Sequence, residues 1–135
     1  MINQYKPAGY NSVSPYIMVD GARKFIDMLI QIFEAKEKRS YVRTDGSVMH
    51  AELQIDDSVI MIADATEKYP AYHFWLHIYV LDVDKIFEKA VEYGCEVIES
   101  PTMKEGDTDR RGTLRDFTGN FWAVGTQIEE DKNVS

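Results

Sequence analysis

Alternation of polar and apolar residues is clearest between residues 48 and 64. The first half of this stretch has the two-residue period of a strand with one buried face. The second half, residues 59–63, is apolar on both faces, as in a strand covered on both sides. Because only Asp56 and Asp57 separate the halves, the stretch predicts a β-hairpin. The polar residues of its first half are His50, Glu52 and Gln54.

Pairing across that turn identifies the side chains that share a face. If Ile55 lies opposite Ser58, then Glu52 lies opposite Met61. The other face is aliphatic, and we expect it to pack on a helix. The mixed face holds two titratable groups among apolar ones, which is typical of a small-molecule cavity. Its members are His50, Glu52, Val59, Met61 and Ala63.

The rest of the pattern predicts the same arrangement twice. The first copy has a strand, a helix, a strand and the hairpin, over residues 13–19, 20–36, 37–43 and 48–64. The second has a strand, a helix, a strand, a loop and a hairpin, over residues 74–80, 82–94, 95–99, 100–109 and 112–127. Asp20 and Asp82, 62 positions apart, are the predicted helix N-caps, and Gly94 is the predicted end of the second helix.

This internal repeat predicts an α+β fold of two βαβββ modules. We expect curved mixed sheets around a cleft, with the helices outside. The modules span about residues 13–64 and 73–127 and are expected to form a single domain of 135 residues. A polar lead-in over residues 1–12 and an acidic tail over residues 128–135 flank them.

The composition narrows the range of partners. A formal net charge of −8 argues against nucleic acid and anionic membranes as partners. The sequence shows neither a signal peptide nor an apolar run long enough to cross a membrane. A single cysteine, Cys95, fits a reducing compartment, so the expected location is the cytoplasm.

Six short motifs follow one another between about residue 7 and residue 127. They are Pro7-x-Gly9-Tyr10, Val13-Ser14-Pro15-Tyr16, Val48-Met49-His50-Ala51-Glu52-Leu53, Asp57-Ser58-Val59-Ile60-Met61, Leu76-His77-Ile78-Tyr79-Val80, and Asp109-Arg110-Arg111-Gly112 through Asp116-x-x-Gly119-x-x-Trp122. With the paired modules, they resemble the vicinal oxygen chelate superfamily, which holds glyoxalase I, bleomycin-resistance proteins and extradiol dioxygenases. The PhnB-type, glyoxalase-like branch is the closer resemblance.

The resemblance implies positions for the metal that some members bind. Four ligands from the first and last strands of the modules would fall at Ser14, Met61, His77 and Ala123. Of these, His77 is an ordinary ligand, whereas methionine and alanine offer nothing to a hard divalent ion. We therefore expect no metal at this four-ligand site and no cofactor. The alternative is a divalent metal at a displaced site made of His50, Glu52 and His77.

The resemblance also identifies the mixed face as the cavity face. His50 and Glu52, about 7 Å apart along a strand, are then the candidate catalytic acid–base pair, and a solvated outer face is the alternative. The expected ligand-binding residues are His50, Glu52, His77, Tyr16, Met61, Trp75, Tyr79, Arg111 and Phe121. Arg110, Arg111 and Arg115 either orient an anionic ligand or form salt bridges with nearby aspartates.

Three functions remain open. The first is a metal-independent small-molecule-binding protein of the glyoxalase/bleomycin-resistance type. The second is a lyase or isomerase that acts on a small oxygenated substrate with a displaced metal or a His–Glu pair. The third is a protein that sequesters an antibiotic or toxin, for which the acidic composition favours cationic ligands. The resemblance, together with the apolar strand faces, implies a homodimer.

Overall fold

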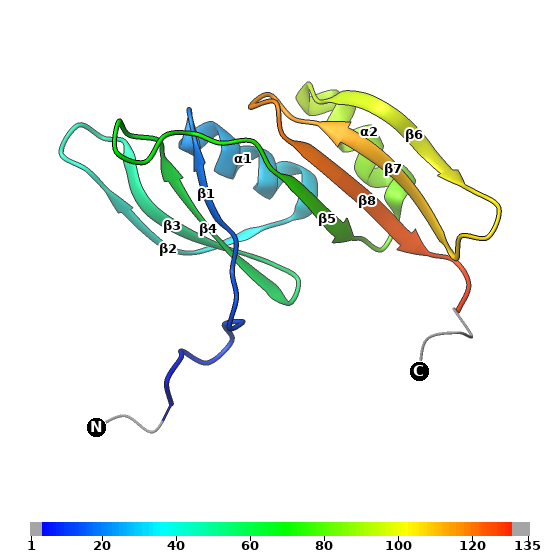
Figure 1. The fold of residues 1–135 in the computed structure, drawn as a ribbon, viewed down its shortest axis with the longest axis horizontal. Helices are drawn as coiled ribbons and strands as arrows, with labels where there is room; N and C mark the ends of the chain where they lie inside the picture. The colour runs from blue at the N-terminus through cyan, green and yellow to red at the C-terminus, as the bar shows by residue number, and fades with distance from the viewer. Residues whose placement is uncertain (1–3, 131–135) are drawn as a thin grey trace. The chain divides into compact units, whose positions relative to one another are not determined.

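The computed structural model describes residues 4–130 and divides the chain after Tyr72 into two compact units, Met1–Tyr72 and His73–Ser135 (Figure 1). Residues 1–3 of the expected lead-in and 131–135 of the expected tail lie outside the described residues. The first unit contains β1 (Tyr16–Val19), α1 (Ala22–Phe33), β2 (Lys36–Val42), β3 (Val48–Ile55) and β4 (Ser58–Asp64). The second contains β5 (Trp75–Tyr79), α2 (Val83–Tyr93), β6 (Glu96–Met103), β7 (Asp109–Arg115) and β8 (Phe121–Gln127). The predicted α+β fold of two βαβββ modules is confirmed.

Each unit is built on one four-stranded mixed sheet. The strand order is β1-β4-β3-β2 in the first unit and β5-β8-β7-β6 in the second. In each sheet the first strand runs parallel to the last, and the other pairs are antiparallel. The predicted hairpin register is confirmed, with Ile55 opposite Ser58 and Glu52 opposite Met61. The mixed face therefore carries the side chains expected of it.

The aliphatic face of the first sheet packs against α1, as expected. Alternate residues of three strands are fully buried there, among them Ile17, Leu53 and Ile62. Phe25 and Leu29 are among the residues of α1 that are fully buried. Burying each such side chain contributes about 1.5–3 kcal/mol, so this packing stabilises the sheet that carries the mixed face.

The helix of the second unit approaches its sheet at a glycine. A Cβ on Gly112 would lie 2.6 Å from the Phe87 ring of α2 and 2.7 Å from the carbonyl oxygen of Glu99. In the same unit, the buried Trp122 donates its indole N–H to Asp116 over 2.8 Å. The same carboxylate accepts a backbone N–H from Thr118, so it links the β7–β8 turn to the core.

The first helix begins later than predicted, and Asp20 is not its N-cap. Gly21 occupies the cap position with φ 83° and no side-chain cap. The N–H of Ala22 is bound instead by Asp64 at the end of β4, over 2.8 Å, and the second oxygen of Asp64 accepts the Val48 N–H over 2.7 Å. The helix ends at Phe33, before the predicted Lys36, because the next residue turns to φ 57°. The strand before it starts at residue 16, since Pro15 lacks an N–H for pairing.

The second unit matches its prediction at the helix ends and departs from it at the following strand. Asp82 caps α2 by accepting the Lys85 N–H over 3.2 Å, and Gly94 ends it with φ 110°. The predicted loop over residues 100–109 is confirmed only for residues 104–108, because β6 continues to Met103 and β7 begins at Asp109. Pro101 is tolerated because β6 is an edge strand whose register shifts between residues 99 and 102.

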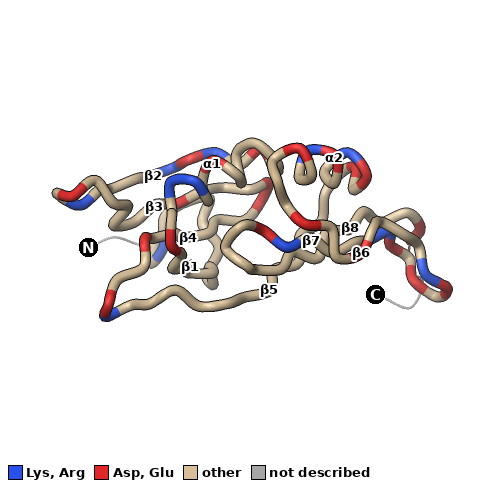
Figure 2. The backbone as a smooth tube through the Cα atoms, turned by 90° about the horizontal axis from the view of Figure 1, so that it is seen from above, with Lys and Arg blue, Asp and Glu red and all other residues tan. Residues whose placement is uncertain are grey.

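Charge is distributed unevenly over the elements. Both helices carry acidic and basic residues, whereas β5 carries none (Figure 2). Among residues 4–130, no helix is long and apolar enough to cross a membrane.

Candidate functional site

The mixed face of the first sheet carries a continuous chain of hydrogen bonds, which we call the Glu52 cluster: Tyr10, Tyr16, His50 and Glu52. The hydroxyl of Tyr10 donates to Oε1 of Glu52 over 2.5 Å. The other carboxylate oxygen lies 2.8 Å from Nε2 of His50. Nδ1 of His50 lies 2.7 Å from the hydroxyl of Tyr16. Four side chains are thus joined end to end.

Strand geometry explains how the inner members of the cluster meet. His50 and Glu52 are two residues apart on β3, so they share one face. Met61 of β4 lies opposite Glu52, and Tyr16 of β1 lies opposite Met61. The Tyr16 side chain therefore crosses β4 to reach the imidazole of His50, with Met61 as its half-buried apolar neighbour.

The outer member, Tyr10, comes from the segment before the first strand. This segment is attached to the sheet by Asn11, whose side-chain oxygen accepts the Val59 N–H over 3.0 Å. The Tyr10 ring also has the Lys38 ammonium 4.7 Å from its centroid, a cation–π contact. The lead-in thus contributes a functional group to the mixed face.

The carboxylate of Glu52 is buried yet held in its ionised form. It is 5% exposed. Burial by itself would raise its pKa, but hydrogen bonds from Tyr10 and His50, aided by the charge of Arg39, hold the pKa of Glu52 below its usual value. The Arg39 guanidinium lies 3.7 Å from the carboxylate. The hydrogen bond to Glu52 is also the main reason why the pKa of Tyr10 is raised.

The hydrogen bonds of the Glu52 cluster run in one direction, from the hydroxyl of Tyr16 through His50 to the buried carboxylate of Glu52. An ionised carboxylate only accepts hydrogen bonds, so Nε2 of His50 donates to Glu52. In a neutral imidazole, Nδ1 is then the acceptor for the Tyr16 O–H. Tyr16 is 41% exposed. The cluster can therefore present a hydroxyl, backed by a base and a carboxylate, to a ligand.

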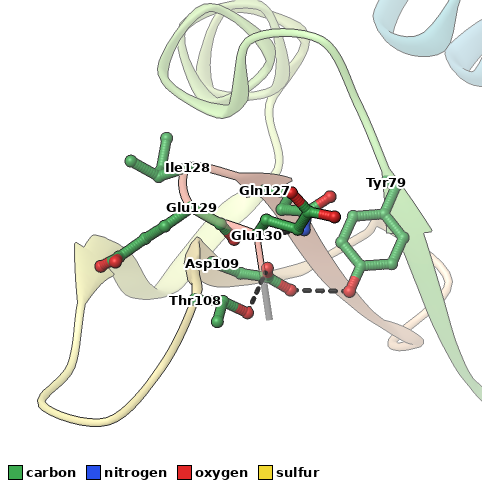
Figure 3. A pocket seen from close by; sticks show the side chains of 7 residues that line it. All are labelled: Tyr79, Thr108, Asp109, Gln127, Ile128, Glu129 and Glu130. Atoms are coloured by element: carbon green, nitrogen blue, oxygen red, sulfur yellow. Dashed lines mark hydrogen bonds between the residues drawn. The ribbon is translucent and has the colours of Figure 1, made fainter. Parts of the chain in front are cut away.

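The second unit carries its own polar group around Asp109, a carboxylate that is 3% exposed. Tyr79 donates its hydroxyl to Asp109 over 2.6 Å, and Arg111 donates to the same oxygen over 2.7 Å. Figure 3 shows this oxygen and the Tyr79 ring at a pocket of about 730 Å³. The pocket is lined by Tyr79, Thr108, Asp109, Gln127, Ile128, Glu129 and Glu130.

His77 of β5 contacts both Arg111 and Tyr79. Its Nε2 is 3.2 Å from the Arg111 guanidinium, which can only donate, so this nitrogen accepts. Burial, and then the charge of Arg111, lower the pKa of His77, while Asp109 opposes them. His77 is thus set up as a neutral hydrogen-bonded group whose ring meets the Tyr79 ring edge-on at 4.7 Å.

All three arginines lie near carboxylates, with Arg115 3.8 Å from Glu96. Arg110 forms two hydrogen bonds of 2.9 Å with Asp84, and Arg111 is bound by Asp107 and Asp109. Both are therefore salt-bridged, Arg111 to nearby aspartates as expected and Arg110 to Asp84, which lies 26 positions away in the sequence.

The residues do not fit the metal site of the metal-dependent relatives. By register, His77 lies opposite Ala123, and Met61 lies opposite Tyr16. Tyr16, rather than the expected Ser14, is thus the matching position on β1. Thioether and methyl side chains supply no donor for a hard divalent ion. The displaced alternative also finds no support in the donor set, because both nitrogens of His50 already face protein partners.

The described chain, residues 4–130, contains no group of three His, Cys, Asp or Glu side chains able to hold a metal ion. We therefore derive no step through a metal.

The predicted site residues fall into separate sets. Tyr16, His50, Glu52 and Met61 share the mixed face of the first sheet. His77, Tyr79 and Arg111 meet around Asp109, and Trp75 stacks on Phe121 with ring centroids 4.6 Å apart. The sequence reasoning missed Tyr10, Arg39 and Asp109. Tyr10 belongs to the motif Pro7-x-Gly9-Tyr10, but only its tertiary contact shows that Glu52 is its partner.

Comparison with known proteins identifies the family. The chain belongs to the Glyoxalase/Bleomycin resistance protein/Dioxygenase superfamily, which it matches over residues 9–124. An uncharacterized protein of Mycobacterium bovis is 28% identical in an alignment 132 positions long that covers 88% of this chain and 85% of that protein.

Solved structures show the same fold at low sequence identity. The fosfomycin resistance protein FosX from Listeria monocytogenes is 16% identical with a TM-score of 0.70, over 87% of this chain and 93% of that one. A PhnB protein from Bacillus cereus is 15% identical with a TM-score of 0.66, over 86% of this chain and 99% of that one.

Proposed function

We propose that this protein binds a small oxygenated molecule at the Glu52 cluster, without the four-ligand metal of its metal-dependent relatives. The observation that carries the proposal is the unbroken hydrogen-bond chain from Tyr10 to the exposed hydroxyl of Tyr16. Because Glu52 and His50 fix the direction of each hydrogen bond, the Tyr16 oxygen, whose proton is donated to His50, is held ready to accept a hydrogen bond from a hydroxyl group of the ligand. Met61 provides an apolar surface beside it.

The second unit carries its own proposed ligand-binding residues. Trp75 and Tyr79 on β5 are 63% and 59% exposed, so they are large aromatic surfaces open to a ligand. His77, Arg111 and Phe121 complete the set. We further propose that the protein acts in the cytoplasm as a homodimer, and a monomer mass by light scattering at micromolar concentration would remove the dimer.

A thermal-shift screen of metal-free protein tests the binding proposal. The panel contains small 2-oxo acids, phosphonates and cationic antibiotics, all measured in chelator. Hits are then titrated against Tyr16→Phe and against Tyr41→Phe as a matched control, since the Tyr41 ring lies 6.4 Å from the His50 ring. Loss of one hydrogen bond predicts roughly 3- to 10-fold weaker binding in Tyr16→Phe. Equal affinity in both variants, or no hit at all, contradicts the proposal.

A second function, acid–base catalysis, is favoured by the order of groups in the cluster. Glu52 orients His50, and His50 Nδ1 can take the Tyr16 proton as the Tyr16 oxygen accepts a proton from a substrate carbon next to a carbonyl. This proton transfer would serve a lyase or an isomerase. NMR detection of deuterium uptake from D₂O at that carbon tests the idea. Uptake at the rate of buffer alone, or uptake that persists in His50→Gln, would exclude it.

A further inference from the structure

The second unit has a smaller pocket, of about 280 Å³, at the end of the sheet where β7 turns into β8. All of its lining residues belong to this unit, so its shape is defined by one compact body. They are His73, Phe74, Trp75, Arg115, Gly119 and Phe121. Its volume suits a ligand with a single ring.

One wall of this pocket is flat and aromatic. Trp75 of β5 and Phe121 of β8 are direct partners in the parallel register. Their rings stack with centroids 4.6 Å apart and planes within 15°. Since Trp75 is 63% exposed, part of its indole surface remains open for another ring.

Beside this aromatic wall the pocket is cationic. Arg115 of β7 lies opposite Phe121, with its guanidinium carbon 5.8 Å from that ring. It faces Glu96 at 3.8 Å, and both side chains are about half exposed, at 49% and 62%. An ion pair of that length and exposure contributes little. Within residues 4–130 the Arg115 guanidinium has no other ion pair and no hydrogen bond, unlike Arg110, which is held over 2.9 Å.

Gly119 keeps the space beside Arg115 open. Its backbone has φ 85°, a conformation that favours glycine. A Cβ there would lie 3.4 Å from the His73 ring and 3.6 Å from Nη2 of Arg115, so both side chains border one small volume. An imidazole carries at least one N–H in every protonation state common in proteins. Two donor groups therefore flank the aromatic wall.

We propose that this pocket binds a small aromatic carboxylate. The guanidinium of Arg115 receives the carboxylate through its paired N–H groups, His73 adds a donor, and the ring of the ligand stacks on Trp75. In a chain with net charge −8, a cationic pocket selects an anion against the overall field. The proposal assigns a ligand class to Trp75 and Phe121, two members of the proposed binding set, and does not require the Glu52 cluster.

Benzoate titrated into ¹⁵N-labelled full-length protein tests this pocket. The two indole N–H signals separate the outcomes, because Trp75 lines the pocket and Trp122 is buried and bonded to Asp116. We expect a saturable shift of the Trp75 signal and a stationary Trp122 signal. Benzamide, which lacks the charge, and acetate, which lacks the ring, should each bind at least 5-fold more weakly.

Variants complete the test. Arg115→Gln should weaken benzoate at least 5-fold, whereas Arg110→Gln, on the same strand, should not change it. The Trp122 signal reports whether each variant is folded. Equal binding of benzamide, unchanged binding by Arg115→Gln, or a stationary Trp75 signal overturns the proposal. Tyr16→Phe should bind benzoate normally, so failure of the Glu52 cluster and failure of this pocket remain distinguishable.

Discussion

Replacing Tyr10 with phenylalanine removes one hydroxyl from the Glu52 cluster and keeps the ring. That hydroxyl donates over 2.5 Å to a carboxylate that is 5% exposed. A hydrogen bond to a charged group contributes about 1.5–3 kcal/mol. Because Tyr10 stays partly exposed, we expect a loss near the lower end, about 1.5–2 kcal/mol, measured as the free energy of unfolding in urea at pH 7.

The pH dependence of this loss identifies its cause. The folded-state pKa of Glu52 is depressed, so its stabilisation is present above the unfolded pKa of about 4.3 and disappears as the pH falls through the folded value. Tyr10→Phe raises the folded pKa toward the unfolded one. The difference between the two proteins should therefore shrink below about pH 4, to the roughly 0.5–1 kcal/mol of a neutral hydrogen bond.

The matched control is Tyr5→Phe, in the same segment. Tyr5 is 86% exposed, and its removed hydroxyl should change stability by less than about 0.5 kcal/mol. The reasoning fails if Tyr10→Phe behaves like this control. It also fails if the loss does not diminish as the pH is lowered from 7 through the folded-state pKa of Glu52, because the ionised carboxylate would then not be the partner.

Three further predictions concern single sites elsewhere. Gly112→Ala should cost about 2–3 kcal/mol in urea, because the new Cβ would lie 2.6 Å from the Phe87 ring; a loss below about 0.5 kcal/mol would show that the helix moves freely. Asp64→Ala should cost about 2–3 kcal/mol, since one carboxylate accepts the N–H groups of Ala22 and Val48, and an unchanged unfolding midpoint would refute that role. Burial, with a smaller effect of a nearby carboxylate, raises the pKa of Cys95 to about 11. Its reaction with a disulfide reagent at pH 8 should be roughly 20-fold slower than that of an ordinary cysteine, and a normal rate would contradict the burial.

Local patterns predicted the elements whose faces differ clearly in polarity. The hairpin register came out as expected because slipping β3 by one residue would expose Leu53 and bury Gln54. Asp82 and Gly94 were identified because capping depends on residues next to the helix. These features require no knowledge of distant parts of the chain.

Tertiary contacts decided the features that the sequence reasoning missed. The cap of α1 comes from Asp64, 42 residues beyond Ala22, so a search beside the helix finds Asp20 instead. Tyr10 joins Glu52 across the same separation of 42 residues. His50 and Glu52 were predictable as a pair, since strand alternation places them on one face. Their outer partner Tyr10 was not, because the polar lead-in has no alternation of polar and apolar residues that would assign a side chain to a face.

The central claim is that the Glu52 cluster binds a small molecule through the hydroxyl of Tyr16. A crystal structure of the metal-free protein with the tightest compound from the thermal-shift screen tests it most directly. The account predicts a ligand oxygen within hydrogen-bond distance of Tyr16 and apolar ligand atoms against Met61, with the His50–Glu52 contact of 2.8 Å kept. A ligand that contacts neither Tyr16 nor His50, or one bound through a metal ion at these residues, would contradict it.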